Sequence, residues 1–332
     1  MVYIYKKIVG NKGYYYLRLS ERKGKKVISK DIAYLGNSID DVKKNLEKLS
    51  KYKDEIRKSY KKIHNFIEPN YYLEKIKKLK LKKDIFLKDK LEYIEACKIH
   101  FDEYFKKLDE LTQKEILKNF VIEFSFNTTS IEGNTINLEE ARNLLENGLT
   151  PKDKSLREIY DLQNTERVFF DIYSSKKDIN HEFIVNLHKG LVANIDLRTG
   201  YRTTDIRVIK SNFDATPGPY VKTDMDLLLK WHDKNKEKLH PLTLATIFHH
   251  KFEKIHPFMD GNGRTGRILF TYILLKNKYP PIIIRKKTRK EYLEALRKAD
   301  KSGLQEFNTD NYFDLLQFCA DELIEGYWSL FL

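Results

Sequence analysis

Cysteine is nearly absent from this 332-residue chain, and no apolar run approaches the length that crosses a bilayer. The two cysteines, Cys97 and Cys319, lie far apart without metal-ligand spacing. This argues against a disulfide framework and a thiolate metal site, so we expect buried thiols. Residues 1–10 carry no secretory signal. These absences predict a cytoplasmic protein with no membrane segment.

Acidic residues are scarce at the start of the chain. Residues 1–90 contain 26 Lys and Arg against 11 Asp and Glu, whereas the remainder contains 36 against 37. The formal net charge of +14 is therefore carried by an N-terminal appendage. Excess basic charge is typical of proteins that bind nucleic acid, so a nucleic-acid partner is one hypothesis for this region. The near-neutral body must have a different chemistry.

Three runs rich in aromatic and β-branched residues open the chain, with glycine-containing turns between them. They cover residues 2–5, 14–20 and 26–32. The runs predict a small three-stranded antiparallel sheet over residues 1–36. Its Tyr, Arg and Lys side chains suit stacking on single-stranded nucleic acid, contact with a protein partner, or only packing and solubility. The residues alone leave all three open.

Apolar residues of 37–84 recur at three- or four-residue steps among many lysines, which predicts an amphipathic helical connector broken at Pro69. The pattern of residues 85–332 is almost entirely helical, without strand–helix alternation or a fixed repeat. We therefore expect a mainly α body with a small β appendage. The predicted helices cover residues 90–108, 113–125, 138–147, 153–173, 180–191, 242–255, 287–299 and 309–326. The aromatic end, 327–332, would either dock on the body or form the interface of a homodimer.

Chemically active residues are concentrated at positions 256–267, His-Pro-Phe-Met-Asp-Gly-Asn-Gly-Arg-Thr-Gly-Arg. Pro257 ends the preceding apolar helix and holds His256 at its exit. The glycines at 261 and 263 should form the turn that opens the next helix, where backbone N–H groups and the helix dipole bind phosphate. Arg264 and Arg267 share one face of that helix and can reach the same anion.

Two further residues complete this block. Asp260 lies just before the phosphate cradle, where it could hold a Mg²⁺ ion that bridges phosphate oxygens. His256 lies where an incoming hydroxyl could lose its proton. The block therefore predicts transfer from a nucleoside polyphosphate to a hydroxyl.

Three other interpretations of the block are weaker. Its glycines match the spacing of a dinucleotide fingerprint, but no buried strand precedes them. His249 and His250 lie near His256 and Asp260, yet adjacent histidines on a helix point in different directions and would not converge on a metal. A plain turn with surface arginines leaves the His, Asp and Asn unexplained.

At these positions the chain resembles the Fic family, whose signature His-x-Phe-x-Asp/Glu-Gly-Asn-Gly-Arg-x-x-Arg is matched at every specified position. The resemblance implies a Fic-type helical bundle and a protein adenylyltransferase, which transfers AMP from ATP to a Ser, Thr or Tyr hydroxyl of another protein or of itself. His256 would be the general base and Asp260 the Mg²⁺ ligand. By the same resemblance, the triphosphate is bound by Gly261, Asn262, Gly263, Arg264 and Arg267.

Residues 128–133, Thr-Thr-Ser-Ile-Glu-Gly, are similar to the Ser/Thr-x-x-x-Glu-Gly/Asn inhibitory motif of Fic proteins. The matching residues are Thr128, Glu132 and Gly133. In that family the glutamate pairs with the second arginine of the signature, here Arg267, and withholds it from the γ-phosphate. Because the motif precedes the catalytic block, the chain resembles the class with an N-terminal inhibitory helix. The alternative is an ordinary helix end with Gly133 as its cap.

Residues 200–221 alternate with period two around a turn-rich centre, which predicts a β-hairpin. In the Fic family a hairpin at this place is the flap over the active site, and its edge aligns the target segment by strand addition. The flap residues implied in docking are Thr204, Ile206 and Val208. The alternative is a surface hairpin that only packs.

Two other functions stay open at this point. The same site can run in reverse, with the inhibitory glutamate positioning a water that removes AMP from a modified protein. Alternatively, the protein is a regulator that binds nucleic acid through residues 1–82 and uses the helical body for control.

Overall fold

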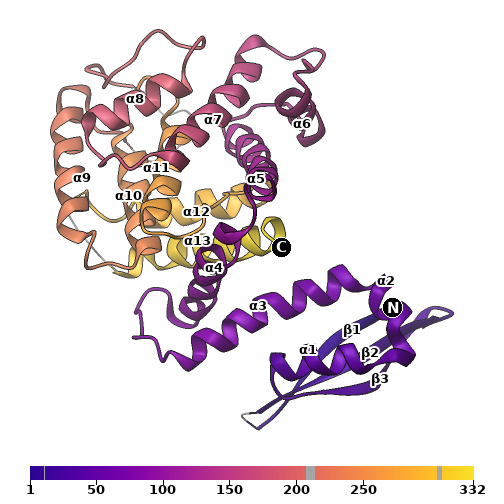
Figure 1. Cartoon of the computed structure of the whole chain (residues 1–332). Helices are drawn as coiled ribbons and strands as arrows, with labels where there is room; N and C mark the ends of the chain where they lie inside the picture. Colours follow the sequence, from indigo (N-terminus) through magenta and orange to yellow (C-terminus); the bar gives the residue numbers. More distant parts are fainter. Residues whose placement is uncertain (11, 207–213, 305–308) are drawn as a thin grey trace. The chain divides into compact units, whose positions relative to one another are not determined.

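The computed structural model describes residues 1–10, 12–206, 214–304 and 309–332 (Figure 1). The chain divides into two compact units. The first contains Met1–Lys82 with Glu95–His100 and Leu332, and the second contains Lys83–Ile94 and Phe101–Phe331. The described part of the chain is mainly helical, and its one small sheet lies at the N-terminus, as the sequence predicts.

The sheet of the first unit is antiparallel with strand order β1-β2-β3. The strands are β1 (Val2–Val9), β2 (Lys12–Lys23) and β3 (Lys26–Gly36), each longer than the aromatic run that predicts it. Pairs such as Ile4 with Leu17 set the register and place apolar side chains on one face, where they join the core of this unit. The predicted three-stranded sheet is confirmed.

Three helices follow the sheet, α1 (Ile39–Lys48), α2 (Lys53–Lys58) and α3 (Tyr60–Lys78), with the short 3₁₀ turn η1 (Ser50–Tyr52) between the first two. The predicted break at Pro69 is wrong, because Pro69 lies inside α3. A proline inside a helix costs roughly 3 kcal/mol. Ile63 and Ile67 before it and Ile76 after it are all buried, and packing on both sides outweighs that cost.

The second unit is built around a central helix pair, α10 (Pro241–Ile255) and α11 (Asn262–Lys276). Helix α10 also packs on α9 and α13, and α11 packs on α5, α7 and α8 (Figure 1). The other helices of this unit are α5 (Glu110–Ile131), α6 (Leu138–Asn147), α7 (Leu156–Ser174), α8 (His181–Leu191), α9 (Val221–Asn235), α12 (Arg289–Ala299) and α13 (Thr309–Leu330). Helix α4 (Leu91–Glu103) is divided between the units, with Glu95–His100 assigned to the first. Short 3₁₀ turns are η2 (Lys88–Lys90), η3 (Phe105–Lys107), η4 (Gly218–Tyr220) and η5 (Lys286–Thr288).

Helix α5 continues six residues beyond its predicted end at Ser125. The residues of 127–130 are polar and poor helix formers, which is why the sequence suggests an earlier end. Their side chains are nevertheless buried, and two of them bond to distant segments: Asn127 accepts the backbone N–H of Lys286 at 2.8 Å, and the Thr128 hydroxyl accepts from Arg267 at 2.6 Å. Tertiary contacts therefore extend the helix up to Glu132, its C-cap.

The predicted hairpin of 200–221 is only partly testable. In the described flanks, 200–206 and 214–217, the backbone forms no strand. The assignment of Pro219 to Val221 to a returning strand is wrong, because Pro219 lies in η4 and Val221 begins α9. Proline with its fixed φ suits the first turn of a helix, and this local preference prevails here. The centre of the hairpin, including Val208, lies outside the described residues.

The aromatic end of the chain is docked. Helix α13 runs to Leu330, and Phe331 is 2% exposed, with its ring 5.0 Å from that of Phe105 and 5.5 Å from that of Phe120. The aromatic end is therefore not an exposed apolar surface, and the homodimer interface predicted from it loses its basis. Both cysteines are buried free thiols, as predicted. No helix in the described part of the chain is long and apolar enough to span a bilayer.

Candidate active site

The block of residues 256–267 lies at the junction of α10 and α11. Helix α10 ends at Ile255, and His256 is its C-cap with left-handed φ 52° and ψ 61°. The chain then turns through Pro257 and Asp260 to Gly261, the N-cap of α11 at φ 75°. Glycine is favoured at that φ because it has no Cβ. The helix end and helix start predicted from Pro257 and the glycines are confirmed.

The imidazole of His256 is held in one tautomer. Its Nδ1 lies 3.2 Å from the carbonyl oxygen of Glu253, and because a carbonyl only accepts, Nδ1 carries the proton. The lone pair is therefore on Nε2. Burial lowers the pKa of His256 below its ordinary value, so the ring is neutral at neutral pH. A neutral imidazole with a defined basic nitrogen suits a general base.

A cradle for an anion stands at the start of α11. The backbone N–H groups of Asn262, Gly263 and Arg264 belong to its first turn and have no intrahelical acceptor. The Asn262 side chain is engaged elsewhere: its amide accepts from the N–H of Phe258 and donates to the carbonyl of Phe258, both at 2.8 Å. Asn262 thus braces the loop, and its backbone contributes to the cradle.

Arg267 is buried and bound to the end of helix α5. Its Nε donates to Thr128 Oγ1 at 2.6 Å, and one terminal nitrogen donates to the Thr128 carbonyl at 3.0 Å and to Glu132 Oε1 at 2.7 Å. The contact between Glu132 and Arg267 that the resemblance implied is therefore present. A Cβ on Gly263 would clash with the Glu132 carboxylate, so this carboxylate stands directly over the anion cradle.

The Glu132 carboxylate is ionised in this arrangement. Partial burial works to raise its pKa, but Arg267 and then Arg264 outweigh this effect and hold the pKa of Glu132 below its ordinary value. Its side chain is 45% exposed, whereas that of Arg267 is 4% exposed. The acidic partner can therefore leave toward solvent, while the arginine stays in place.

Arg264 and Asp260 each have a partner that sequence reasoning missed. Arg264 donates to the carboxylate of Asp161, which projects from α7 and is largely buried. Asp260 is paired with Arg157 at the start of α7 and lies 3.8 Å from Arg264. Burial raises the pKa of Asp161, although Arg264 opposes the effect. An acidic residue at a core position of an amphipathic helix was the one signal that could have found Asp161.

Arg202 is a second missed residue, and it joins the loop of 256–267 to both flanks of the predicted flap. It is 4% exposed. Its guanidinium donates to the carbonyls of His256 at 2.8 Å and Thr204 at 2.9 Å, and also to that of Thr216. Its backbone N–H donates to the Pro257 carbonyl at 2.9 Å. Arg202 therefore holds the backbone of His256 in place, and no local pattern in the sequence marks it.

Of the flap residues that the structure describes, Thr204 contacts the loop of residues 256–267. Thr204 lies beside the catalytic loop, its hydroxyl 3.8 Å from the sulfur of Met259. Ile206 is half-buried in the same irregular segment. Asp205 accepts the backbone N–H of Gly218 at 2.7 Å and so ties the two flanks together. Val208 lies outside the described residues.

The histidines considered for a transition metal point apart. His249 is hydrogen-bonded to Tyr292 at 2.6 Å, and His250 to Tyr312 and Asp300 at 3.0 Å each. Over the residues described, no cluster of three or more His, Cys, Asp or Glu side chains could hold a metal ion. A cation at Asp260 would therefore need further oxygen ligands from a substrate.

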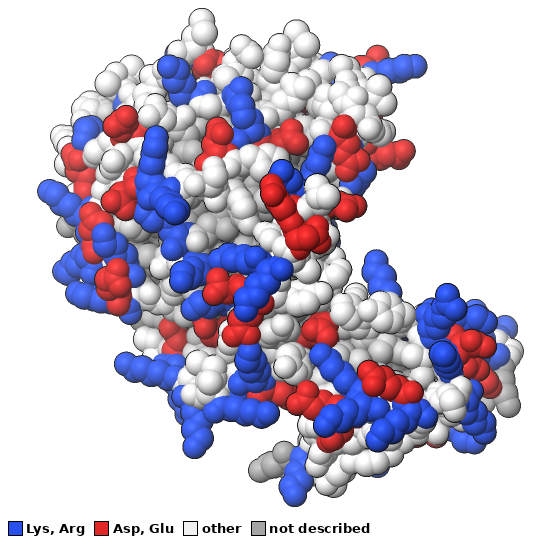
Figure 2. Space-filling model, in the orientation of Figure 1, with Lys and Arg blue, Asp and Glu red and all other residues white. Residues whose placement is uncertain are grey.

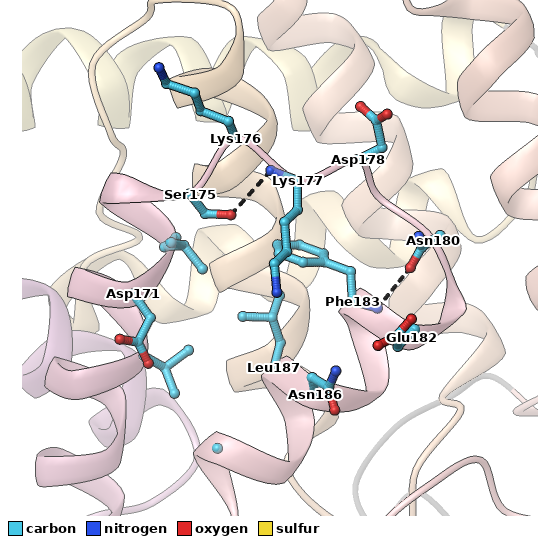
Figure 3. A pocket seen from close by; sticks show the side chains of 13 residues that line it. Asp171, Ser175, Lys176, Lys177, Asp178, Asn180, Glu182, Phe183, Asn186 and Leu187 are labelled. Atoms are coloured by element: carbon cyan, nitrogen blue, oxygen red, sulfur yellow. Dashed lines mark hydrogen bonds between the residues drawn. The ribbon is translucent and has the colours of Figure 1, made fainter.

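Two cavities in the second unit are candidates for a ligand site. A cavity of about 260 Å³ lies at the cradle, lined by Glu132, Gly133, Asn134, Arg157, Glu158, Asp161, Asp260, Gly261 and Arg264. A larger one of about 750 Å³ lies between α7 and α8, where Lys177, Asp178 and Asn186 project around it (Figure 3). None of the residues of 256–267 lines the larger cavity. The smaller cavity is the one lined by residues of the 256–267 loop, Asp260, Gly261 and Arg264.

The fold and this site define a helical domain in which a glycine-containing loop joins two central helices. Residues 178–274 match the model of the Fic/DOC family. These residues therefore correspond to a Fic domain.

Relatives with assigned names agree with this. The chain is 30% identical over 190 residues to the protein adenylyltransferase fic-1 of Caenorhabditis elegans, covering 55% of this chain and 37% of that protein. It is 32% identical over 192 residues to the protein adenylyltransferase Fic of Drosophila melanogaster, covering 55% and 38%. The chain thus spans under two fifths of the length of these relatives.

Solved structures share the fold. A Fic-domain signaling protein from Bacteroides thetaiotaomicron is 23% identical with a TM-score of 0.65, covering 70% of this chain and 94% of that one. Fic-1 from Caenorhabditis elegans is 25% identical with a TM-score of 0.61, covering 72% and 70%.

Proposed function

We propose that this protein is an adenylyltransferase that transfers AMP from ATP to a hydroxyl side chain of a protein, and that Glu132 holds it in an inhibited state. One observation carries the proposal: an ionised carboxylate occupies the second signature arginine and covers the anion cradle beside a histidine poised as a base. Relatives named protein adenylyltransferase support the activity.

The reaction follows from the placement of His256 and the cradle. Nε2 of His256 takes the proton of the acceptor hydroxyl, whose oxygen attacks the α-phosphorus of ATP. The bond from that phosphorus to the bridging oxygen of the β-phosphate breaks, and pyrophosphate leaves. The first-turn N–H groups of α11 and the guanidinium of Arg264 stabilise the developing negative charge.

The residues present fit a Mg²⁺ ion. Asp260 offers a hard carboxylate oxygen at the edge of the cradle, and Mg²⁺ is commonly bound by one or two carboxylates together with substrate phosphates. When bound, the ion would neutralise charge on the phosphate oxygens. Asp260 is paired with Arg157 in this structure, so Arg157 must release the carboxylate before it can serve as a ligand.

Glu132 would inhibit the protein by occupying the place of the ATP phosphates. With Glu132 bound to Arg267, that guanidinium is withheld from the γ-phosphate, and the carboxylate repels an incoming polyanion. The cavity of about 260 Å³ is also smaller than the roughly 300–1,000 Å³ of ordinary small-molecule sites. Departure of Glu132 would enlarge the site and free Arg267 together.

The acceptor is a protein, either another chain or this one. We propose that the segment around Thr204, Ile206 and Val208 docks a stretch of the acceptor and brings its hydroxyl to His256. The position of Thr204 beside Met259 and the link from Arg202 to His256 support a mechanical connection between this segment and the base.

The test compares label transfer from ATP labelled at the α-phosphate, in the presence of Mg²⁺, among the wild type and four variants. Glu132→Ala should raise incorporation at least about tenfold, because a charge-assisted pair on Arg267 is removed. His256→Ala, alone or combined with it, should abolish transfer, since a general base contributes about 10²–10⁴-fold.

The matched control is Glu139→Ala, an exposed glutamate at the start of α6. It should behave as the wild type. Unchanged incorporation in Glu132→Ala with His256 still essential would disprove inhibition by Glu132. Absence of transferred label in every variant, together with no bound nucleotide, would disprove the transferase itself.

Removal of AMP is the second candidate, favoured by the ionised state of Glu132 beside the cradle, because a carboxylate there could orient a water. A target adenylylated beforehand would be incubated with the protein, with and without ATP. Release of AMP that is lost in Glu132→Ala would assign this direction. Binding of nucleic acid by the basic N-terminal unit is independent of both directions.

A further inference from the structure

The sheet of the N-terminal unit is covered by helices on one face only. Side chains such as Val2, Leu17 and Leu35 lie in one core cluster with Ile39 of α1 and Ile63 of α3. Because side chains alternate along a strand, their neighbours point to the opposite face. The core of this unit, with its helices, lies on the first face. From α3, the Lys62 ammonium also reaches Tyr3 at the edge of the opposite face, 4.9 Å from the ring centre.

The opposite face bears five tyrosines, which we call the tyrosine face: Tyr3, Tyr5, Tyr14, Tyr16 and Tyr34. The register places Tyr5 opposite Tyr16, and Tyr16 opposite Tyr34, so one aromatic row crosses all three strands. The rings of Tyr16 and Tyr34 are 5.3 Å apart, and Tyr34 is 53% exposed. A row of neighbouring rings on the open face of a sheet is a platform for other planar, unsaturated groups.

Positive charge surrounds this row. The guanidinium of Arg18 lies 3.6 Å from the centre of the Tyr5 ring, and Lys7 is paired in register with Tyr14. Of the acidic residues, Asp31 is paired in register with Arg18 and bonds to it at 2.6 Å. Residues 1–82 as a whole contain 23 Lys and Arg against 9 Asp and Glu. On the face drawn in Figure 2, the Lys and Arg side chains are spread over this unit.

We propose that the tyrosine face binds single-stranded nucleic acid, with bases stacked on the tyrosines and phosphates near Lys7, Arg18 and the neighbouring lysines. Aromatic rings combined with basic charge are the two requirements of such a surface. A duplex hides its base faces, and an acidic peptide would match the lysines but leave the aromatic row without stacking partners. Charge complementarity and the row together favour the single strand.

The experiment uses the full-length protein and fluorescence anisotropy of a labelled oligothymidylate or oligouridylate of about 15 nucleotides, long enough to span a stacking platform. Tyr34→Ala should weaken binding at least about fivefold, because loss of one stacked base costs roughly 1 kcal/mol or more. Tyr34→Phe keeps the ring and should remain within about twofold of the wild type.

Tyr60→Ala is the matched control. Tyr60 is 63% exposed on α3, on the helical side of the sheet, and should tolerate the change without loss of binding. If Tyr34→Ala fails to fold, Lys7→Gln replaces it and should flatten the dependence of binding on salt by about 0.7 in log–log slope. Lys61→Gln, on α3, should leave that slope unchanged.

The proposal would be overturned by no saturable binding of either oligonucleotide at low salt or by equal weakening in Tyr34→Ala and Tyr60→Ala. Binding to a duplex of the same length that is as tight as to the single strand would overturn it too. His256→Ala should bind as the wild type does. Loss of binding in that variant would place the oligonucleotide in the active site and also overturn the proposal.

Discussion

The two units of this protein use charge in opposite ways. In the helical unit the signature arginines Arg264 and Arg267 are 2% and 3% exposed, and each is bonded to a carboxylate. In the N-terminal unit most lysines remain in water and outnumber the acids. Charge that stabilises a transition state must be desolvated and fixed, whereas charge that attracts a polyanion acts from solution.

A second difference lies within the helical unit. Asp161, the partner of Arg264, is 13% exposed, while Glu132, the partner of Arg267, is 45% exposed and caps a helix end. The first pair is part of the core. The second can separate without leaving a buried carboxylate behind, which is what a removable inhibitor requires.

The largest expected effect tests this difference directly. Asp161→Ala leaves the Arg264 guanidinium buried without its acid and should lower the free energy of unfolding by about 3–5 kcal/mol, as removal of one partner of a buried pair does. Glu132→Ala also leaves a buried guanidinium, but Arg267 keeps its bonds to the hydroxyl and carbonyl of Thr128. The carboxylate that is removed is partly solvated, so the loss should be smaller, about 1 kcal/mol. Chemical denaturation of both variants gives the comparison. Equal losses would show that the two pairs are equally structural.

A smaller expected effect is a difference in salt dependence between the two units. Raising ionic strength from about 50 to 200 mM should weaken oligonucleotide binding by the N-terminal unit at least tenfold if several phosphates are contacted. AMP transfer by Glu132→Ala should change by less than about threefold over the same range, because buried pairs are screened little. Both are measured on the same preparation. A steep salt dependence of transfer would contradict the contrast between the units.

The smallest expected effect concerns the pH at which kcat/KM begins to fall. Burial lowers the pKa of His256, so its neutral form persists as pH falls below the ordinary histidine value of about 6.5. In the Glu132→Ala variant, kcat/KM should therefore stay level through that pH and decline only at lower pH. A profile from about pH 5 to 8 decides the matter. Half-loss above about pH 6.5 would show that the imidazole is not desolvated when it acts.

Much of the helical unit was predictable because its signals are local. Pro257 and the glycines of the loop define where α10 ends and α11 begins, and Leu138–Asn147 was predicted at its observed bounds. Local signals also gave two wrong helix ends, at Pro69 and at the polar end of α5. In both places local preference favoured a break, and packing of distant side chains overrode it.

The partners of the site residues divide in the same way. Glu132 was expected near Arg267 through resemblance to a family, since 135 positions separate them and no pattern in between links the two. Asp161, Arg157 and Arg202 were not found at all. Each is an ordinary charged residue in the sequence, and its importance arises only from what lies opposite it.

The sequence by itself determined the chemistry available to this protein: a histidine at a helix exit, a glycine cradle at a helix start, two arginines one turn apart, and a basic appendage rich in tyrosine. Those features follow from neighbours within a few residues, where backbone geometry leaves few choices. Only the tertiary structure decided which acid each arginine holds and which face of the small sheet stays open. Such pairings depend on contacts between segments far apart in the chain, which local geometry does not specify.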